Sequence, residues 1–281
     1  MKSFFFCALL ILLAVSHSPL TTSQEYDDES EWDYLEDSGK GPEHWGDLNE
    51  NWTICKNGTR QSPINLRDGW VDKRPLGRLQ TSYNPANATL LNRGHDIMLQ
   101  WVNYAGSLHI DGIDYELKQC HWHSPSEHIV NGHRFDLEVH MVHQSLDGKI
   151  AVVGILYKID EIFLREDPFL RELRAPLDVL ADGNVNETVV GVVDPYHLIM
   201  DGGGEYYRYM GSLTTPPCTE DVVWTVLKEP CIRPVSFDQV KKLRDAVHDY
   251  ARSNARPIQQ FNGRELLLNE PSPDSTTLQS I

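Results

Sequence analysis

Three of the five histidines within residues 119–140, namely His121, His123 and His140, limit the fold of this chain more than any other feature of the sequence. Side chains alternate between the two faces of a β-strand, so His121 and His123 lie on the same face. Further along the chain, Asn131–Gly132 is flanked by β-forming residues. An Asn-Gly pair in this setting is the strongest short-range signal for a hairpin, because a type I′ turn needs positive φ at both central residues. The segment therefore predicts two antiparallel strands joined at this turn.

This hairpin predicts a register that brings a third histidine to the pair. If the turn sets the pairing, opposite residues have numbers that sum to 263, so His140 lies opposite His123 and diagonal to His121. Ser124–Pro125 can insert a bulge and shift this register, because proline removes a hydrogen-bond donor from the ladder. The prediction is that three imidazoles converge from two strands.

The polar residues near these histidines favour a metal site. A His-x-His pair alone is also typical of an ordinary strand face with two surface imidazoles. By the same alternation, however, Gln119, Glu127 and Glu138 share the histidine face, where a buried carboxylate is costly unless it accepts hydrogen bonds from the metal ligands. Three neutral imidazoles leave the full charge on Zn²⁺ and one tetrahedral position open to water. We therefore predict a zinc centre of the catalytic kind.

Turn-forming residues divide most of the chain into short β-rich runs, which predicts a mainly β protein of the α+β class. We expect a large, twisted, mostly antiparallel central sheet with a few peripheral helices. The predicted strands are 97–104, 119–123, 135–143, 150–158, 206–209 and 222–227.

Two helices are predicted outside this sheet. A short one spans 167–173, and a clearer one begins at Ser236, which forms a capping box with Gln239. An apolar stripe at helical spacing follows in the second helix and indicates core packing rather than a partner site. The stripe consists of Val240, Leu243, Val247 and Tyr250.

Four segments are predicted along the chain. Residues 1–23 contain a lysine, an apolar run and then small residues, which is typical of a cleavable secretory signal rather than of a buried first helix. Residues 24–37 form an acidic segment, and 38–270 form one domain, since no repeat or Ser/Gly linker divides them. Residues 271–281 are rich in Ser, Thr and Pro without apolar periodicity, which predicts a frayed tail.

The charge of the chain limits its partners. Forty-one acidic and 25 basic residues give a net charge of −16, which argues against nucleic acid and against an anionic membrane surface. No apolar run reaches the roughly 18 residues that a membrane span requires.

Sequons and cysteines agree with passage through the secretory pathway. Four Asn-x-Thr sequons are glycosylation acceptors, at Asn51, Asn57, Asn87 and Asn186. If Cys7 leaves with the signal, three complete disulfide pairings are open to the remaining cysteines in an oxidising compartment. These cysteines are Cys55, Cys120, Cys218 and Cys231.

With these residues in view, the sequence resembles the α-carbonic anhydrase family, particularly its secreted plant-type members, from about Tyr34 to Glu270. The shared motifs stand in the family's order and at compatible spacing, which chance does not supply. They are Gly41-Pro-Glu-His-Trp45, Gln61-Ser-Pro-Ile-Asn65, Gln119-Cys-His-Trp-His123 with Ser-Pro-Ser-Glu-His128, Glu138-Val-His140, Gly211-Ser-Leu-Thr-Thr-Pro-Pro217, Trp224 and Asn254-Ala-Arg-Pro257.

The resemblance implies roles for individual residues of the site. The implied zinc ligands are His121, His123 and His140, and their hydrogen-bond acceptors are Gln119, Asn254 O and Glu138. Glu127 accepts the hydroxyl proton of Thr214, which obliges that oxygen to accept a hydrogen bond and to orient the attacking group. A wall for carbon dioxide is implied for residues that would otherwise be ordinary core, namely Val142, Val152, Leu213, Thr215, Val222 and Trp224.

His95 matches the position of the family's proton shuttle, and an imidazole with a pKa of about 6.5 suits that role. Without the resemblance, an ordinary exposed histidine is an equally good interpretation of His95. Arg93 replaces a small polar residue expected from the best-known animal members, and a cation beside the water chain is expected to lower shuttle efficiency. Tyr34 is matched to an active-site tyrosine.

The resemblance also pairs Cys55 with Cys218. A bridge that closes so long a loop is worth on the order of 4 to 5 kcal/mol in the chain-entropy model, and it would pin the loop that carries Thr214. No pairing is implied for Cys120 or Cys231, and strand alternation places Cys120 away from the histidines as a buried thiol.

The implied activity is the zinc-dependent, reversible hydration of carbon dioxide to bicarbonate and a proton, with sulfonamides or anions as inhibitors. One alternative is a carbonic-anhydrase-like storage or carbohydrate-binding protein, against which the retained histidines, Glu127 and Thr214 argue. Another is an esterase, for which the sequence specifies no extra oxyanion donors or acyl pocket. We expect an extracellular, apoplastic location, with a plastid or a vacuole as alternatives, and the sequence leaves the oligomeric state open.

Overall fold

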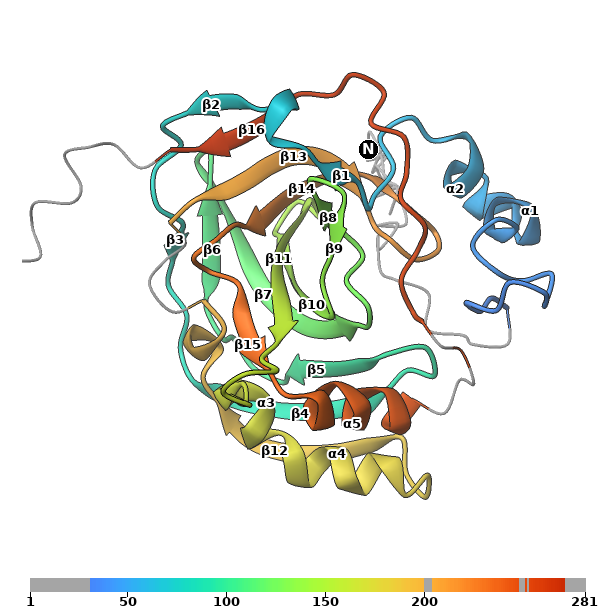
Figure 1. The fold of residues 1–281 in the computed structure, drawn as a ribbon, viewed down its shortest axis with the longest axis vertical. Coiled ribbons are helices and arrows are strands. Elements are labelled where there is room, and N and C mark those ends of the chain that lie inside the picture. Colours follow the sequence, from blue (N-terminus) through green and yellow to red (C-terminus); the bar gives the residue numbers. More distant parts are fainter. Residues whose placement is uncertain (1–30, 200–203, 248–250, 252, 271–281) are drawn as a thin grey trace, which may run out of the picture.

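Figure 1 shows the computed structural model, which describes residues 31–199, 204–247, 251 and 253–270. The predicted signal at 1–23 and tail at 271–281 lie outside the described residues, as does Tyr250. Strands make up much more of the described chain than helices do, which confirms the prediction of a mainly β fold.

One large twisted sheet organises the described residues (Figure 1). Its strands are β2 (Asp72–Arg74), β3 (Gln80–Thr81), β4 (Ala86–Asn92), β5 (Ile97–Trp101), β6 (Ser107–Ile110), β7 (Ile113–His123), β10 (Leu137–Ser145), β11 (Ile150–Ile159), β12 (Glu187–Val193), β13 (Tyr206–Ser212), β14 (Glu220–Leu227), β15 (Arg233–Val235) and β16 (Leu266–Asn269). They follow the order β12-β4-β5-β7-β10-β11-β14-β13-β16-β2, with β3, β6 and β15 off this path. Neighbours are mostly antiparallel, as predicted, and parallel pairing occurs between β11 and β14, β11 and β15, and β16 and β2.

A second, smaller sheet contains β1 (Asn65–Leu66), β8 (Ile129–Val130) and β9 (His133–Arg134). The Asn131–Gly132 turn joins β8 to β9 and closes a shorter hairpin than predicted. Within β7 and β10, His140 lies opposite His121 and not opposite His123. The predicted register is therefore wrong by two positions along the longer strands.

Glu127 and His128 cause this shift. The Ser126 N–H donates to the Phe135 carbonyl at 3.0 Å, and the Phe135 N–H donates to Ser126 Oγ at 2.9 Å, which continues the register of β7 and β10. The next residue pair already belongs to β8 and β9, so Glu127 and His128, which lie between these two pairs, are not part of the strand pairing. The register changes here and not at Ser124–Pro125. Because the shift is an even number of residues, the three histidines keep the face that strand alternation predicts for them.

The helices lie at the periphery, as predicted. They are α1 (Trp45–Leu48), α2 (Ile54–Asn57), α3 (Pro168–Glu172), α4 (Arg174–Ala181) and α5 (Phe237–Val247). The capping box of α5 is confirmed, because the Ser236 N–H donates to Gln239 Oε1 at 3.1 Å and the Gln239 N–H donates to Ser236 Oγ at 3.3 Å. The sequence did not predict α4, which packs against α5 and the edge strand β12.

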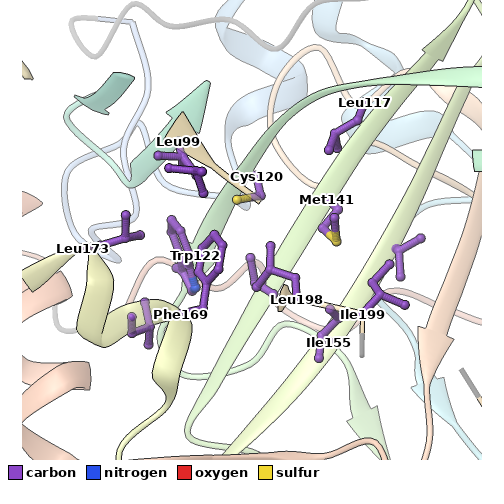
Figure 2. Packing of buried hydrophobic residues seen from close by; sticks show 14 of the residues in the cluster. Leu99, Leu117, Cys120, Trp122, Met141, Ile155, Phe169, Leu173, Leu198 and Ile199 are labelled. Carbon is purple, nitrogen blue, oxygen red and sulfur yellow. The ribbon is translucent and has the colours of Figure 1, made fainter. Parts of the chain in front are cut away.

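The two faces of β7 and β10 have different surroundings. Cys120, Trp122 and Met141 point into the largest hydrophobic cluster (Figure 2). Cys120 is a free, fully buried thiol there, as predicted. A smaller cluster, which includes Val152 and Trp224, lies on the histidine side, where the Trp224 ring packs against His140. The large core thus fixes β7 and β10 from one side and leaves the histidine side for chemistry.

Candidate metal centre

Three buried imidazoles meet on the face of the sheet that is turned away from the large core. His121 and His123 extend from β7, and His140 extends from β10 directly opposite His121. The candidate ligand atoms of the three rings all lie within 4.8 Å of one another. Strand alternation and the antiparallel pairing are sufficient to explain why the rings converge.

Each imidazole is oriented by a hydrogen bond from the ring nitrogen that faces away from the other two. The bonds run from His121 Nδ1 to Gln119 Oε1 (2.9 Å), from His123 Nδ1 to Asn254 O (2.8 Å) and from His140 Nε2 to Glu138 Oε1 (3.0 Å). These are the three contacts that the resemblance implies. The remaining ring nitrogens are thereby directed to one point, since the two nitrogens of a histidine take different partners.

The donor set fits a zinc ion. Burial, opposed in part by Asp96, lowers the pKa of His121 well below its usual value, which keeps the ring in the neutral form that binds metals. His123 Nε2 is buried without a hydrogen-bond partner among the described residues, and an unsatisfied buried polar atom is costly. A cation at the shared point would satisfy it. Three imidazoles without a thiolate are the ligand set of catalytic zinc.

Glu138 supports this centre through two histidines. Its Oε1 accepts from His128 Nδ1 at 2.7 Å as well as from His140, and its Oε2 accepts from the His128 N–H at 2.8 Å. Burial alone would raise the pKa of this carboxyl, but His128 and His140 hold it well below its usual value. The network continues from Tyr209, whose hydroxyl is 2.7 Å from His128 Nε2, to Ser62 Oγ at 2.8 Å. The trio of Glu138 and its two histidines therefore supports the first centre and is not a second one.

Glu127 lies beside the converging nitrogens. Its Oε2 is 3.6 Å from His123 Nε2 and 3.9 Å from His140 Nδ1. The carboxylate accepts hydrogen bonds from the Thr214 hydroxyl and from the Arg256 N–H, the latter at 2.8 Å. Burial raises the pKa of Glu127 above its usual value, against the opposing effects of His123 and the two donors. Thr214 is also buried, so the pair is held away from bulk water next to the histidines.

The apolar residues that the resemblance implies gather in one cluster. Buried members are Val152, Leu213, Val222 and Trp224, and the partly buried Val142 packs against them. The ring centroid of Trp224 is 4.8 Å from that of His140. Thr215, which follows Thr214, is buried as well. This apolar wall beside the imidazoles suits a small nonpolar molecule.

His95 is buried, with 4% of its surface exposed, and its ring packs on Trp32 at 4.2 Å between centroids. Tyr34 packs edge-on against the same tryptophan. Arg93 does not stand as an isolated cation beside His95, because its Nε donates to Asp96 Oδ1 at 2.8 Å and its Nη2 reaches the other oxygen. Asp96 Oδ2 lies 3.9 Å from His95 Nε2. The acid thus neutralises the cation that was expected to lower shuttle efficiency.

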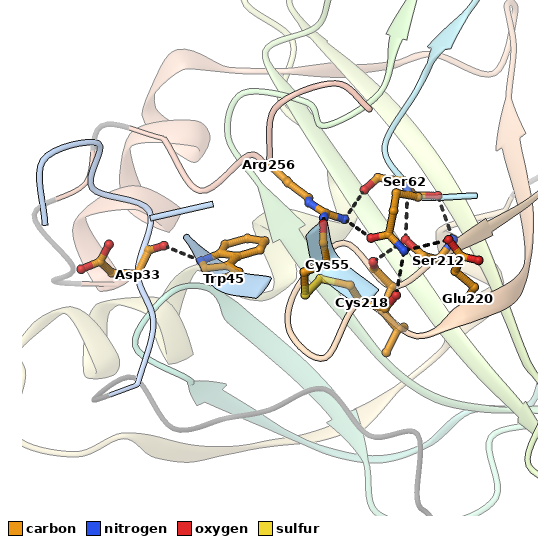
Figure 3. Close-up of a disulfide and its surroundings, with 10 residues drawn as sticks. Asp33, Trp45, Cys55, Ser62, Ser212, Cys218, Glu220 and Arg256 are labelled. Carbon is orange, nitrogen blue, oxygen red and sulfur yellow. Dashed lines mark hydrogen bonds between the residues drawn. A yellow bond between two sulfur atoms is a disulfide. The ribbon is translucent and has the colours of Figure 1, made fainter. Parts of the chain in front are cut away.

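Cys55 in α2 and Cys218 form a disulfide, as predicted (Figure 3). The Cys218 N–H donates to the Thr215 carbonyl at 2.8 Å, and Gln61 Nε2 donates to the Cys218 carbonyl at 3.1 Å. Arg256 Nη2 donates to the Cys55 carbonyl at 2.9 Å. The bridge and these bonds hold the turn that follows Thr214. Cys120 and Cys231 are free.

The structure also brings in three residues that the sequence analysis did not assign. Arg256 connects Glu127 to Gln61 and to the disulfide, and His128 connects Glu138 to Tyr209. Both stand inside the motifs that carry the family resemblance, and those motifs are the signal that could have identified them. Asp96 offered no signal beyond its place next to His95, because a single aspartate does not reveal its own burial.

Comparisons with known proteins agree with this geometry. The profile of the family described as eukaryotic-type carbonic anhydrase matches residues 40–270. Over 270 residues the chain is 49% identical to alpha carbonic anhydrase 7 of Arabidopsis thaliana, and the aligned region covers 95% of this chain and 96% of the relative. Among solved structures, dioscorin complexed with ascorbate has a TM-score of 0.82 at 44% identity, over 86% of this chain and 99% of the other. The α-carbonic anhydrase of Thermovibrio ammonificans with the inhibitor sulfanilamide has a TM-score of 0.74 at 35% identity, over 84% of this chain and 98% of the other.

Among the described residues, no helix has both the length and the apolar character to cross a membrane.

Proposed function

Because this chain belongs to the eukaryotic-type carbonic anhydrase family, we propose that it catalyses the zinc-dependent, reversible hydration of carbon dioxide to bicarbonate and a proton. The observation that carries the proposal is the convergence of three buried imidazoles with Glu127 and Thr214 beside them. A protein that had lost this chemistry would have no physical need to keep three neutral rings directed at one point.

The residues of the chain divide the work. Zn²⁺ held by His121, His123 and His140 would supply the Lewis acidity that makes a nucleophile of water near neutral pH. Glu127 accepts a hydrogen bond from the Thr214 hydroxyl, so the Thr214 oxygen can only accept a hydrogen bond from the attacking oxygen. That bond turns the attacking lone pair toward the substrate carbon. Orientation of this kind lowers the barrier because the reacting atoms are already aligned.

Two further parts of the site bind carbon dioxide and move the proton. The apolar wall, which consists of Val142, Val152, Leu213, Thr215, Val222 and Trp224, holds a substrate that is too nonpolar to be held by hydrogen bonds. His95 carries the product proton to buffer, since an imidazole titrates in the neutral range. Its ring packs on Trp32 and lies 3.9 Å from Asp96 Oδ2, and these two contacts hold its position.

A second candidate function is binding or storage with little or no catalysis. The observation in its favour is the 44% identity to dioscorin, which was solved with ascorbate. The intact imidazole trio favours catalysis instead, and the two functions differ in a measurable way. A binding protein would show no metal-dependent turnover of carbon dioxide.

The test is the metal content of the purified protein together with stopped-flow hydration of carbon dioxide, with and without a chelator. We expect about one equivalent of zinc and an activity that the chelator removes and added zinc restores. His140→Gln is expected to abolish zinc retention and activity together, whereas the buried Cys120→Ala serves as a control away from the site. An aryl sulfonamide is expected to bind only the metal-loaded protein. A zinc-loaded protein without turnover would leave the binding function in its place.

We further propose that the protein is exported to the apoplast, with a plastid or a vacuole as alternative destinations. The four sequon asparagines are all exposed, and the Cys55–Cys218 disulfide suits an oxidising compartment. Protein isolated from its source should lose mass on treatment with an N-glycosidase, and an unchanged mass would count against this route.

A further inference from the structure

Gly154 lies in β11 directly opposite His140 of β10. Its φ is not in the left-handed region, so the backbone at this position would accept an ordinary L-residue. The space beside Gly154, however, would not accept a side chain. A Cβ at Gly154 would lie 2.9 Å from Glu138 Oε1, closer than real Cβ contacts come, while the next nearest atoms, on Val226 and Trp224, would lie at ordinary distances of 3.5 and 3.6 Å. The conflict therefore falls on the Glu138 carboxylate alone.

That carboxylate is not free to move away. Its Oε1 accepts from His140 Nε2 at 3.0 Å and from His128 Nδ1 at 2.7 Å, and its Oε2 accepts from the His128 N–H at 2.8 Å. Glu138 is fully buried, so water cannot replace a bond that is lost. A displacement large enough to admit a methyl group would lengthen the bond to His140 or the bonds to His128.

We propose that Gly154 is a positioning residue of the metal centre: the missing side chain provides the space in which Glu138 holds the ring of His140 toward the metal. The glycine acts only through Glu138 and touches neither metal nor substrate. This inference rests on the proposed zinc function and assigns to it a residue outside the ligand set and its hydrogen-bond acceptors. Hydrogen-bond acceptors of this kind set the orientation of ligating histidines and commonly change metal affinity by about 10- to 100-fold.

The test compares Gly154→Ala with a matched Gly69→Ala control. Gly69 also lacks a left-handed φ, and a Cβ there would meet nothing within 4 Å. Zinc dissociation into excess chelator and the visible absorption spectrum of the Co²⁺-substituted protein are measured for each. We expect zinc to leave Gly154→Ala about 10- to 100-fold faster, with an altered cobalt spectrum, and Gly69→Ala to match the wild type. A merely structural glycine would lower the unfolding temperature and leave the cobalt spectrum unchanged.

A second pair of variants shows whether the effect passes through Glu138. Glu138→Asp shortens the side chain by one methylene and withdraws the carboxylate from the space next to residue 154. Adding Gly154→Ala to this variant is expected to change zinc dissociation by less than about twofold, and the double variant is expected to fold even if Gly154→Ala alone does not. Equal effects of Gly154→Ala in both backgrounds, or a wild-type cobalt spectrum in the single variant, would overturn the inference. Both results leave the proposed function intact, because that function fails only if the wild-type protein takes up no zinc or, when loaded with zinc, does not hydrate carbon dioxide.

Discussion

Removal of the Cys55–Cys218 bridge should lower the stability of this protein by an amount that follows from its place in the chain. The two cysteines are 163 residues apart. In the chain-entropy model, opening a loop of this length increases the entropy of the unfolded chain by about 17 cal/mol/K, or about 5 kcal/mol at 25 °C. The contacts around the bridge add little to the loss, because Arg256 and Gln61 bond to backbone carbonyls that alanine retains.

The variant that tests this is Cys55→Ala/Cys218→Ala, with Cys120→Ala as a control for the loss of a buried sulfur. Urea unfolding at equilibrium provides the measurement. For an m-value of about 2.5 kcal/mol/M, a loss of 5 kcal/mol shifts the midpoint downward by about 2 M. The m-value should also rise, since the unfolded chain without the bridge exposes more surface.

A midpoint that falls by less than about 0.5 M would refute the entropic argument, given that it requires a loss several times larger. An equal fall in Cys120→Ala would refute it too, because that cysteine closes no loop. Wild-type protein unfolded in the presence of reductant should reproduce the midpoint of the double variant, which separates the effect of the bridge from that of the new side chains.

Three further predictions concern titration and buried charge. Burial lowers the pKa of His143 to about 4, whereas the unfolded chain has a His143 pKa of about 6.5. Between these two pH values the unfolded chain therefore binds more protons than the folded protein. About 3 kcal/mol of the free energy of unfolding, present above pH 6.5, is lost as the pH falls to 4. His143→Gln should remove that loss, and equal urea midpoint shifts between pH 7 and 4.5 in both proteins would contradict it. His95→Ala should slow hydration of carbon dioxide chiefly in dilute buffer, and an unchanged stopped-flow rate there would remove its shuttle role. Asp96→Asn leaves the Arg93 cation buried without its partner and should lower the free energy of unfolding by about 3 to 5 kcal/mol, measured by thermal unfolding. The exposed Asp47→Asn serves as the control and should lower it by at most about 1 kcal/mol. Equal losses of stability in the two variants would count against the buried pair.

Strand alternation was sufficient to predict which faces the metal-site side chains share, because it depends only on local geometry. The register was not predictable from the turn. The Asn131–Gly132 signal is correct for the hairpin it closes, but nothing local shows that Glu127 and His128 leave the ladder. Only the hydrogen bonds they make elsewhere in the fold hold them there.

Other features that were not predicted from the sequence also depend on tertiary packing. The helix α4 and the edge strand β12 owe their places to packing against α5 and β4, and such contacts override weak local preferences. Asp96 could not be identified as a buried acid, because the sequence shows its neighbour Arg93 but not that the fold buries both side chains. The residues inside the shared motifs could be named because the resemblance to the family matches them position by position.

Glu127 and His128 have opposite tasks although they are neighbours in the chain. Glu127 contacts Thr214 beside the three imidazoles, and His128 hydrogen-bonds to Glu138, which in turn accepts from His140. Loss of both codons would restore a regular hairpin and leave every imidazole on its present side, whereas loss of one would turn the following residues over.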